Sequence, residues 1–242
     1  MWEIDLKTSR KNVQYLFAIE DMITKSQHHK KSVSYAYIEK GDTITMGIAI
    51  LDPSKSLLDE IRKGIAEAIV LPEKEKYLTT KSIKNKSNIH SSLLKTIVVL
   101  DLADDIDYAT KLVDLNLKCI NLPSLFHFKM AYLRQKWNKI LMSTLSKSVS
   151  NMSDEHMLDI LKNIVTQNKI DIDVYIDIVD NKYIISTPSR TIQVDNLDEP
   201  DLIANLIIIS PSSIILSQIN IVSDDTLVLL SYLFGTNKIV VK

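Results

Sequence analysis

Acidic residues, one thiol and a few imidazoles are the side chains with which this 242-residue chain could perform chemistry. Asp171, Asp173 and Asp177 alternate with apolar residues, so one face of a strand would present three carboxylates. Carboxylate oxygens suit Mg²⁺ or Ca²⁺. No second acidic element is identifiable as a partner, and strands with one solvated face commonly alternate in this way. We therefore interpret these aspartates as a solvent-facing surface and predict no metal site among them.

A second set of candidates comprises Cys119 with His127, and the neighbouring residues His28 and His29. A thiol and an imidazole within hydrogen-bond reach would form a nucleophile and its base, but no family motif surrounds the cysteine. A structural zinc ion needs about four ligands, and nothing in the sequence suggests a third ligand beside the two histidines. Cys119 is the only cysteine, which excludes an intrachain disulfide and a paired-cysteine zinc site. We expect it to be a small buried apolar residue and predict no catalytic residue.

The small number and wide spacing of the glycines exclude a glycine-rich phosphate-binding loop. The four glycines, Gly41, Gly47, Gly64 and Gly235, lie far apart. Glycine-rich loops that hold phosphates need several glycines close together. The sequence therefore predicts no nucleotide cofactor, and no other motif indicates a cofactor of a different kind.

Charge is distributed unevenly, although the net charge is only −1. Residues 116–153 contain six basic residues and no acidic one, whereas residues 154–242 contain six basic and 13 acidic residues. The basic segment includes Lys129, Lys136 and Lys139, which helical geometry places on nearly the same side. Arg134 is displaced around the helix, and aromatic side chains accompany these charges. A helix over residues 124–147 could therefore contact a phosphate backbone through the three lysines.

The overall charge favours a different interpretation of this helix. Nucleic-acid-binding proteins are usually basic overall, and the isoelectric point of this chain is near 6.5. We favour a core helix whose lysines meet solvent or are balanced by carboxylates of the acidic C-terminal part. Nucleic-acid binding by Lys129, Lys136 and Lys139 is the alternative.

The elements that would position these side chains follow from periodicity and turn residues. In the first half, we expect helices at Lys11–Lys25, Leu93–Leu100 and Ile106–Leu115 and a hairpin of strands Val33–Ile38 and Thr43–Ile50. Another helix begins at Asp52–Pro53, with the aspartate as its N-cap, and ends at Pro72. The polar residues from Tyr77 to Ser92 favour a loop.

In the second half, the clearest helix is capped by Ser124 and runs to about Lys147. Its apolar stripe consists of Phe126, Met130, Leu133, Trp137, Ile140 and Leu141, widened by Leu125, Phe128 and Tyr132. A helix then begins at Ser153. It precedes a strand over residues 170–178, a tight turn at Asp180–Asn181 and a strand at Lys182–Thr187. Helices at Pro200–Ile209 and Asp224–Phe234 alternate with strands at Ser213–Ile219 and Lys238–Val241, and Gly235 suits a helix C-cap.

Together these elements predict an α+β fold. It would combine an N-terminal hairpin and helices, a long central helix, and a C-terminal sheet covered by helices. The length allows one large domain or two small ones. We place the boundary between an N-terminal α+β region, residues 1–115, and a region with the central helix and the C-terminal α+β elements, residues 116–242.

Three segments of the second half carry a family resemblance. They are Leu125–Leu133, which opens the long helix, Met157–Val165, and Asp201–Leu216 with its Ser-Pro turn and isoleucine-rich strand. Over residues 122–242 the chain resembles the YtxC-type sporulation proteins of endospore-forming bacteria. That family has no assigned chemistry, so the resemblance implies a cellular context and no reaction.

These observations lead to one expected function and two alternatives. Acidic residues near the N-terminus, where a signal peptide would be basic, and apolar runs far short of the roughly 18 residues of a spanning helix predict a cytoplasmic protein. We expect a non-enzymatic accessory protein, associated with sporulation, that acts through contacts with a partner protein. The alternatives are a nucleic-acid-binding protein that uses the basic helix and an enzyme whose site is assembled from scattered residues.

Overall fold

The computed structural model describes residues 1–25, 33–81, 87–144 and 153–241, and it has the predicted α+β fold. His28 and His29 lie outside the described residues. The chain divides into two compact units. Unit 1 comprises Met1–Tyr77 with Asp101–Ile140, and unit 2 comprises Leu78–Leu100 with Leu141–Lys242. Both units are therefore discontinuous in sequence, which differs from the single boundary expected between residues 115 and 116.

The sheet of unit 1 has the strand order β2-β3-β1-β4. The predicted hairpin is present as β2 (Val33–Lys40) and β3 (Thr43–Ile50), and Gly41 turns between them with a φ of 62°. The two strands that complete the sheet were not predicted. β1 (Trp2–Ser9) pairs antiparallel with β3, and the three-residue β4 (Cys119–Asn121) pairs parallel with β1. β4 is too short to produce a periodic signal in the sequence.

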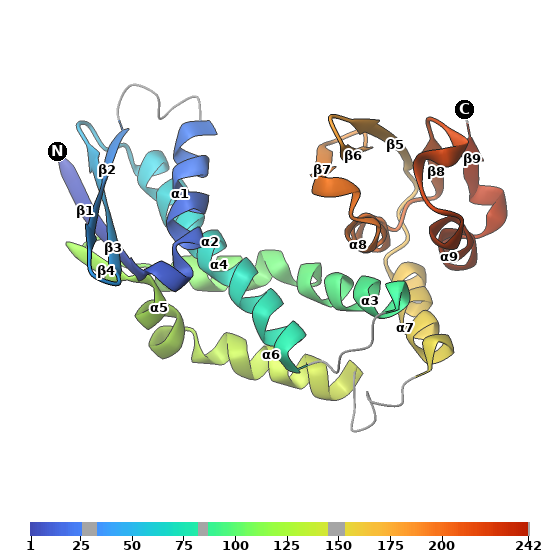
Figure 1. The fold of residues 1–242 in the computed structure, drawn as a ribbon, viewed down its shortest axis with the longest axis horizontal. Helices are drawn as coiled ribbons and strands as arrows, with labels where there is room; N and C mark the ends of the chain where they lie inside the picture. The colour runs from blue at the N-terminus through green and yellow to red at the C-terminus, as the bar shows by residue number, and fades with distance from the viewer. Residues whose placement is uncertain (26–32, 82–86, 145–152, 242) are drawn as a thin grey trace. The chain divides into compact units, whose positions relative to one another are not determined.

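One face of this sheet is buried against helix α1 (Gln14–Lys25), as Figure 1 shows. The buried side chains alternate along the strands and recur at helical spacing in α1: Ile4, Leu6, Met46 and Ile48 from the sheet, and Tyr15, Leu16, Ile19 and Ile23 from the helix. Phe17, also in α1, is exposed and does not contribute to this face. A β-carbon at Gly64 of helix α2 (Lys55–Lys81) would clash with the end of the Met22 side chain, so α1 and α2 approach closely.

Helix α2 differs from the prediction at both ends. Its N-cap is Ser54, whose hydroxyl accepts a hydrogen bond from the Leu57 N–H at 3.1 Å, whereas Asp52 and Pro53 precede the helix. The helix also continues through Pro72 to Lys81. A proline removes one helical hydrogen bond, but the buried side chains on both sides of Pro72, such as Val70 and Lys74, hold the helix in place.

The predicted loop over residues 77–92 was wrong, because most of its described residues are helical. α2 includes residues 77–81, and α3 (Asn88–Val99) begins after Ser87, which accepts a hydrogen bond from the His90 N–H. α3 packs against α8 and α7 and therefore belongs to unit 2. The next helix along the chain, α4 (Leu102–Leu112), belongs to unit 1 again.

The central segment is not one continuous helix. It consists of α5 (Leu122–Ser124), the π-helical turn η2 (Leu125–Lys129), a break at Met130, and α6 (Ala131–Thr144). The core of the predicted stripe is buried, namely Phe126, Met130, Leu133, Trp137 and Leu141. Phe128 and Tyr132, which were expected to widen the stripe, are exposed. The π-helical turn shifts the register of the helix, so Phe128 faces away from the core.

Unit 2 contains a five-stranded sheet with the order β7-β6-β5-β8-β9. The strands are β5 (Asp173–Val179), β6 (Lys182–Ser186), β7 (Thr191–Val194), β8 (Ser213–Leu216) and β9 (Ile239–Val241), of which β7 was not predicted. Its helices, besides α3, are α7 (Asp154–Gln167), α8 (Glu199–Ile209) and α9 (Asp224–Phe234), and α8 and α9 lie along one side of the sheet (Figure 1). The predicted C-terminal sheet covered by helices is therefore confirmed.

Local signals delimit the helices of unit 2, and the predicted caps at Ser153 and Gly235 are both present. Ser153 and Ser223 cap α7 and α9 through their hydroxyl groups, and Asp198 caps α8 through its carboxylate. Gly235 follows α9 with a φ of 97°, a conformation that suits glycine. Within the described residues, no helix is both long and apolar enough to cross a membrane.

The turn between β5 and β6 generates a test of local backbone strain. Asp180 and Asn181 have φ values of 51° and 61°, as a two-residue hairpin turn requires. Asn181→Val should lower the free energy of unfolding by about 1–2 kcal/mol, because β-branched residues are strained in the left-handed backbone conformation. Asn181→Gly should leave stability unchanged or raise it, and urea unfolding followed by circular dichroism measures both variants. Equal effects of the two substitutions would contradict this assignment of the turn.

Candidate functional site

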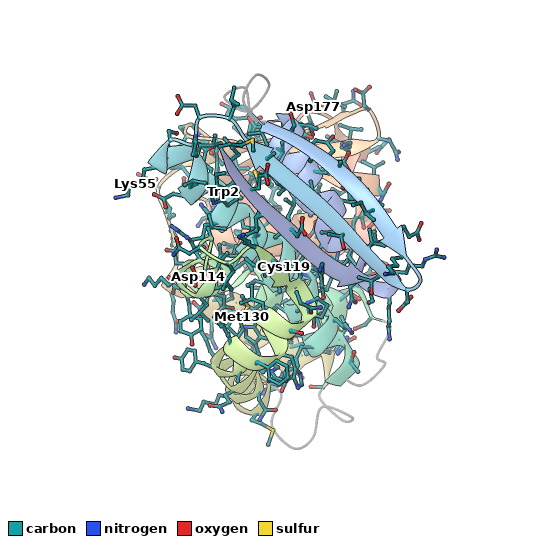
Figure 2. The ribbon with its side chains drawn as sticks, turned by 90° about the vertical axis from the view of Figure 1, so that its left-hand side faces the viewer. Trp2, Lys55, Asp114, Cys119, Met130 and Asp177 are labelled. Atoms are coloured by element: carbon teal, nitrogen blue, oxygen red, sulfur yellow. The ribbon has the colours of Figure 1, made fainter. Side chains whose placement is uncertain are left out.

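A cavity of about 220 Å³ opens beside β4 in unit 1. We call it the β4 pocket. Its lining is mainly apolar: Leu112, Leu117, Ile120, Leu125 and Phe128. The polar residues around it are Asp114, Cys119, Asn121, Ser124 and Lys129. Figure 2 shows Asp114 and Cys119 on the side of unit 1 that faces the viewer.

Three local features of the sequence shape this pocket. The Asn121 side chain accepts a hydrogen bond from the Ser124 N–H at 2.9 Å, so the chain turns from β4 directly into α5. Pro123 occupies the first turn of α5, where its missing N–H costs nothing. Beyond it, η2 ends at Met130, which has a φ of −99° and a ψ of 26°. Phe128 of η2 lines the pocket, and 75% of its surface is exposed.

A second cavity, of about 520 Å³, adjoins the β4 pocket and shares Leu112, Asp114 and Lys129 with it. Arg62, Thr110 and Lys111 complete most of its lining. We call this cavity the basic basin, because three of the side chains around it are cationic. Arg62 is already paired with Asp59 at 2.5 Å, whereas Lys111 and Lys129 are exposed.

The expected burial of Cys119 was wrong, because its thiol is exposed and borders the β4 pocket. β4 is the edge strand of its sheet, and only Ile120 of its three residues points into the core. His127 is occupied elsewhere: its ring Nδ1 lies 3.4 Å from Arg134 Nη1, and its carbonyl accepts a hydrogen bond from Arg134 Nη2 at 2.7 Å. Within the part of the chain that the structure describes, no hydrogen bond joins Cys119 to His127. The arrangement therefore offers no thiol–imidazole pair.

The aspartates of the alternating strand lie in unit 2 and are bound by neighbouring hydroxyl groups. Ser213 donates a hydrogen bond to Asp173, and Ser217 donates one to Asp177 at 2.7 Å. The bond from Ser217, with one from the backbone N–H of Ile178, lowers the pKa of Asp177. Among residues 1–25, 33–81, 87–144 and 153–241, no three His, Cys, Asp or Glu side chains are grouped to hold a metal ion.

The three lysines proposed to contact nucleic acid have different environments. Lys129 and Lys139 are exposed, but Lys136 is held by α4: its Nζ lies 2.7 Å from Asp105 Oδ1 and 3.7 Å from Asp101 Oδ2. Partial burial disfavours the charge of Lys136, but the hydrogen bond and the nearby aspartates outweigh it and raise its pKa. Its charge is thus balanced within unit 1, and not by the acidic C-terminal part as expected.

The same aspartate forms a buried cluster that the sequence did not reveal. Asp105 Oδ2 accepts hydrogen bonds from Lys74 Nζ at 2.9 Å and from Trp137 Nε1 at 2.8 Å, and the side chains of Lys74 and Asp105 are wholly buried. Burial lowers the pKa of Lys74, and the Asp105 carboxylate opposes this effect. The cluster joins α2, α4 and α6 in the interior of unit 1.

No protein-family model, no curated protein and no solved structure matches this chain.

The buried cluster generates a stability prediction. Asp105→Asn should lower the free energy of unfolding by about 3–5 kcal/mol, because it removes the carboxylate that pairs with the buried ammonium group of Lys74. Lys74→Met should lower the free energy of unfolding by less than Asp105→Asn does, since Asp105 keeps its bonds to Lys136 and Trp137. The matched control is Asp104→Asn on the exposed side of α4, which should stay within about 0.5 kcal/mol of the parent protein. Denaturant unfolding ranks the three variants by their free energy of unfolding. An Asp105→Asn variant as stable as the Asp104→Asn control would contradict the prediction.

The environments of the lysines also predict the outcome of a nucleic-acid titration. With Lys136 engaged by Asp105 and Asp101, only Lys129 and Lys139 of the three are free to touch phosphates. Two contacts give a salt slope of only about −1.8. We expect weak or undetectable binding of duplex DNA and of RNA at about 0.15 M salt. Submicromolar affinity that disappears on combining Lys129→Glu with Lys139→Glu would restore the nucleic-acid alternative.

Proposed function

We propose that this chain is a non-enzymatic accessory protein of endospore-forming bacteria and acts by binding another protein through the β4 pocket. The observation that carries the proposal is the exposure of Phe128 on the wall of a mainly apolar cavity. Leu117, on the same lining, is 45% exposed. Exposed apolar surface gathered at one place is typical of a site that another molecule covers.

The chemistry of the lining supports binding over catalysis. A catalytic site needs a nucleophile or base whose geometry converges on one reacting atom. Here the polar groups serve the local fold: Asn121 caps α5, and Asp114 accepts hydrogen bonds from the backbone and side chain of Asn116 at 3.0 Å. Cys119 has no base within hydrogen-bond distance among the described residues. The pocket therefore offers shape and apolar contact.

The sporulation context rests on the resemblance alone. The segment Leu125–Leu133, which resembles the opening of the long helix in the YtxC-type proteins, supplies Leu125, Phe128 and Lys129 to the lining. Under this proposal, the segment contributes to binding as well as to packing. A cytoplasmic location, where a lone exposed thiol stays reduced, is part of the same proposal.

Gene replacement in an endospore-forming bacterium that carries this gene tests the proposal. Deletion should lower spore yield or spore quality, and the parent gene should restore it. Phe128→Glu should fail to restore it, because a charge at the wall of the pocket opposes apolar contact. Val228→Glu is the matched control, since Val228 is 69% exposed on α9 of unit 2 and should be tolerated. Immunoblots verify that the variants accumulate equally, and unchanged sporulation after deletion would overturn the proposal.

A further inference from the structure

One edge of β4 is unpaired within the described residues. β4 is the last strand of its sheet, and on its other side Asp5 N–H donates to the Lys118 carbonyl at 2.9 Å. Because backbone groups alternate along a strand, the N–H and C=O of Ile120 face β1, and those of Cys119 face the open side. Within the described residues, no strand pairs with this side. Such an edge is a template for an added strand.

The β4 pocket lies at this edge, since Cys119, Ile120 and Asn121 all border it. Its volume of about 220 Å³ falls below the roughly 300–1,000 Å³ of typical small-molecule sites. It suits one large apolar side chain. Strand addition combines these two features, because main-chain hydrogen bonds provide affinity and a pocket for alternate side chains provides specificity.

Charge around the edge indicates what should flank that apolar side chain. Lys111 and Lys129 line the basic basin, and Lys118 directly precedes β4. All three are exposed, and none has an ion-pair partner in the described ranges. The only acidic residue in either lining is Asp114, whose carboxylate is already hydrogen-bonded to Asn116. The surface is therefore complementary to carboxylates.

We propose that the open edge of β4 binds an extended segment of a partner protein in which an apolar side chain is flanked by acidic residues. The apolar side chain enters the β4 pocket, the backbone pairs with Cys119, and the acidic side chains meet Lys111, Lys118 and Lys129. This inference rests on the proposed function and names the class of partner that the same site would recognise.

A titration with synthetic peptides tests the inference on the full chain. The probe is a fluorescein-labelled Thr-Glu-Val-Glu-Leu-Glu-Val-Glu-Thr, followed by anisotropy at about 0.15 M salt. We expect saturable binding, and at least about tenfold weaker binding of the peptide with lysines in place of glutamates, because like charges would then meet. A third peptide keeps the acidic side chains but has N-methylated backbone amides, which prevent strand pairing. It should also bind at least about tenfold more weakly.

Substitutions in the protein test whether the peptide binds at the β4 pocket. Phe128→Ala and Lys129→Glu should each weaken binding several-fold, whereas Lys139→Glu makes the same charge change on α6, outside the lining, and should not. Circular dichroism verifies that the variants fold.

A second measurement of binding uses Cys119, the only cysteine in the sequence. A saturating amount of the acidic peptide should slow its alkylation by N-ethylmaleimide several-fold, as measured by mass spectrometry.

Three results would overturn the inference. They are equal binding of the acidic and basic peptides, equal binding of the N-methylated peptide, and equal effects of Lys129→Glu and Lys139→Glu. Self-association that Phe128→Glu abolishes would also overturn it, because the occupant would then be a second copy of the chain. If sporulation depends on Phe128 but none of the peptides binds, strand addition fails while the proposed function stands.

Discussion

One buried carboxylate organises unit 1. Asp105 of α4 accepts hydrogen bonds from Lys74 of α2 and from Lys136 and Trp137 of α6, so a single side chain joins three helices. Removing charges from water is costly, and a buried ion is tolerated only when its partners stay in place. The three helices therefore have little freedom to shift relative to one another.

This constraint reaches the β4 pocket through the chain. α4 ends at Leu112, where the lining of the pocket begins, and only the break at Met130 separates α6 from η2, which carries Phe128 and Lys129. Both walls of the pocket are thus attached to helices that Asp105 holds. A rigid support lowers the ordering cost of binding, which would favour the proposed recognition of an extended segment.

The uneven charge of the chain has a structural explanation in part. The central segment lacks carboxylates, yet Lys136 finds its counter-charge on α4, about thirty residues earlier in the chain. Lys129, with Lys111 and Lys118, has no such partner among the described residues and lies at or beside the two adjoining cavities. These three lysines come from three segments: Lys111 from the last turn of α4, Lys118 from the residue before β4, and Lys129 from η2.

The sequence by itself determined the features that depend on neighbouring residues: the α+β class, the two hairpins, the caps at Ser153 and Gly235, and the alternation that buries Val174 and Ile176 in β5. Only the tertiary structure decided the features that depend on distant residues. α2 continues past Pro72 because its side chains are buried on both sides, and Cys119 is exposed because β1 pairs with β4 on one side only. The Lys74–Asp105–Trp137 cluster joins residues about thirty positions apart. Periodicity and capping report on contacts within a few residues along the chain, and they contain no information about which distant partner will satisfy a buried charge or a strand edge.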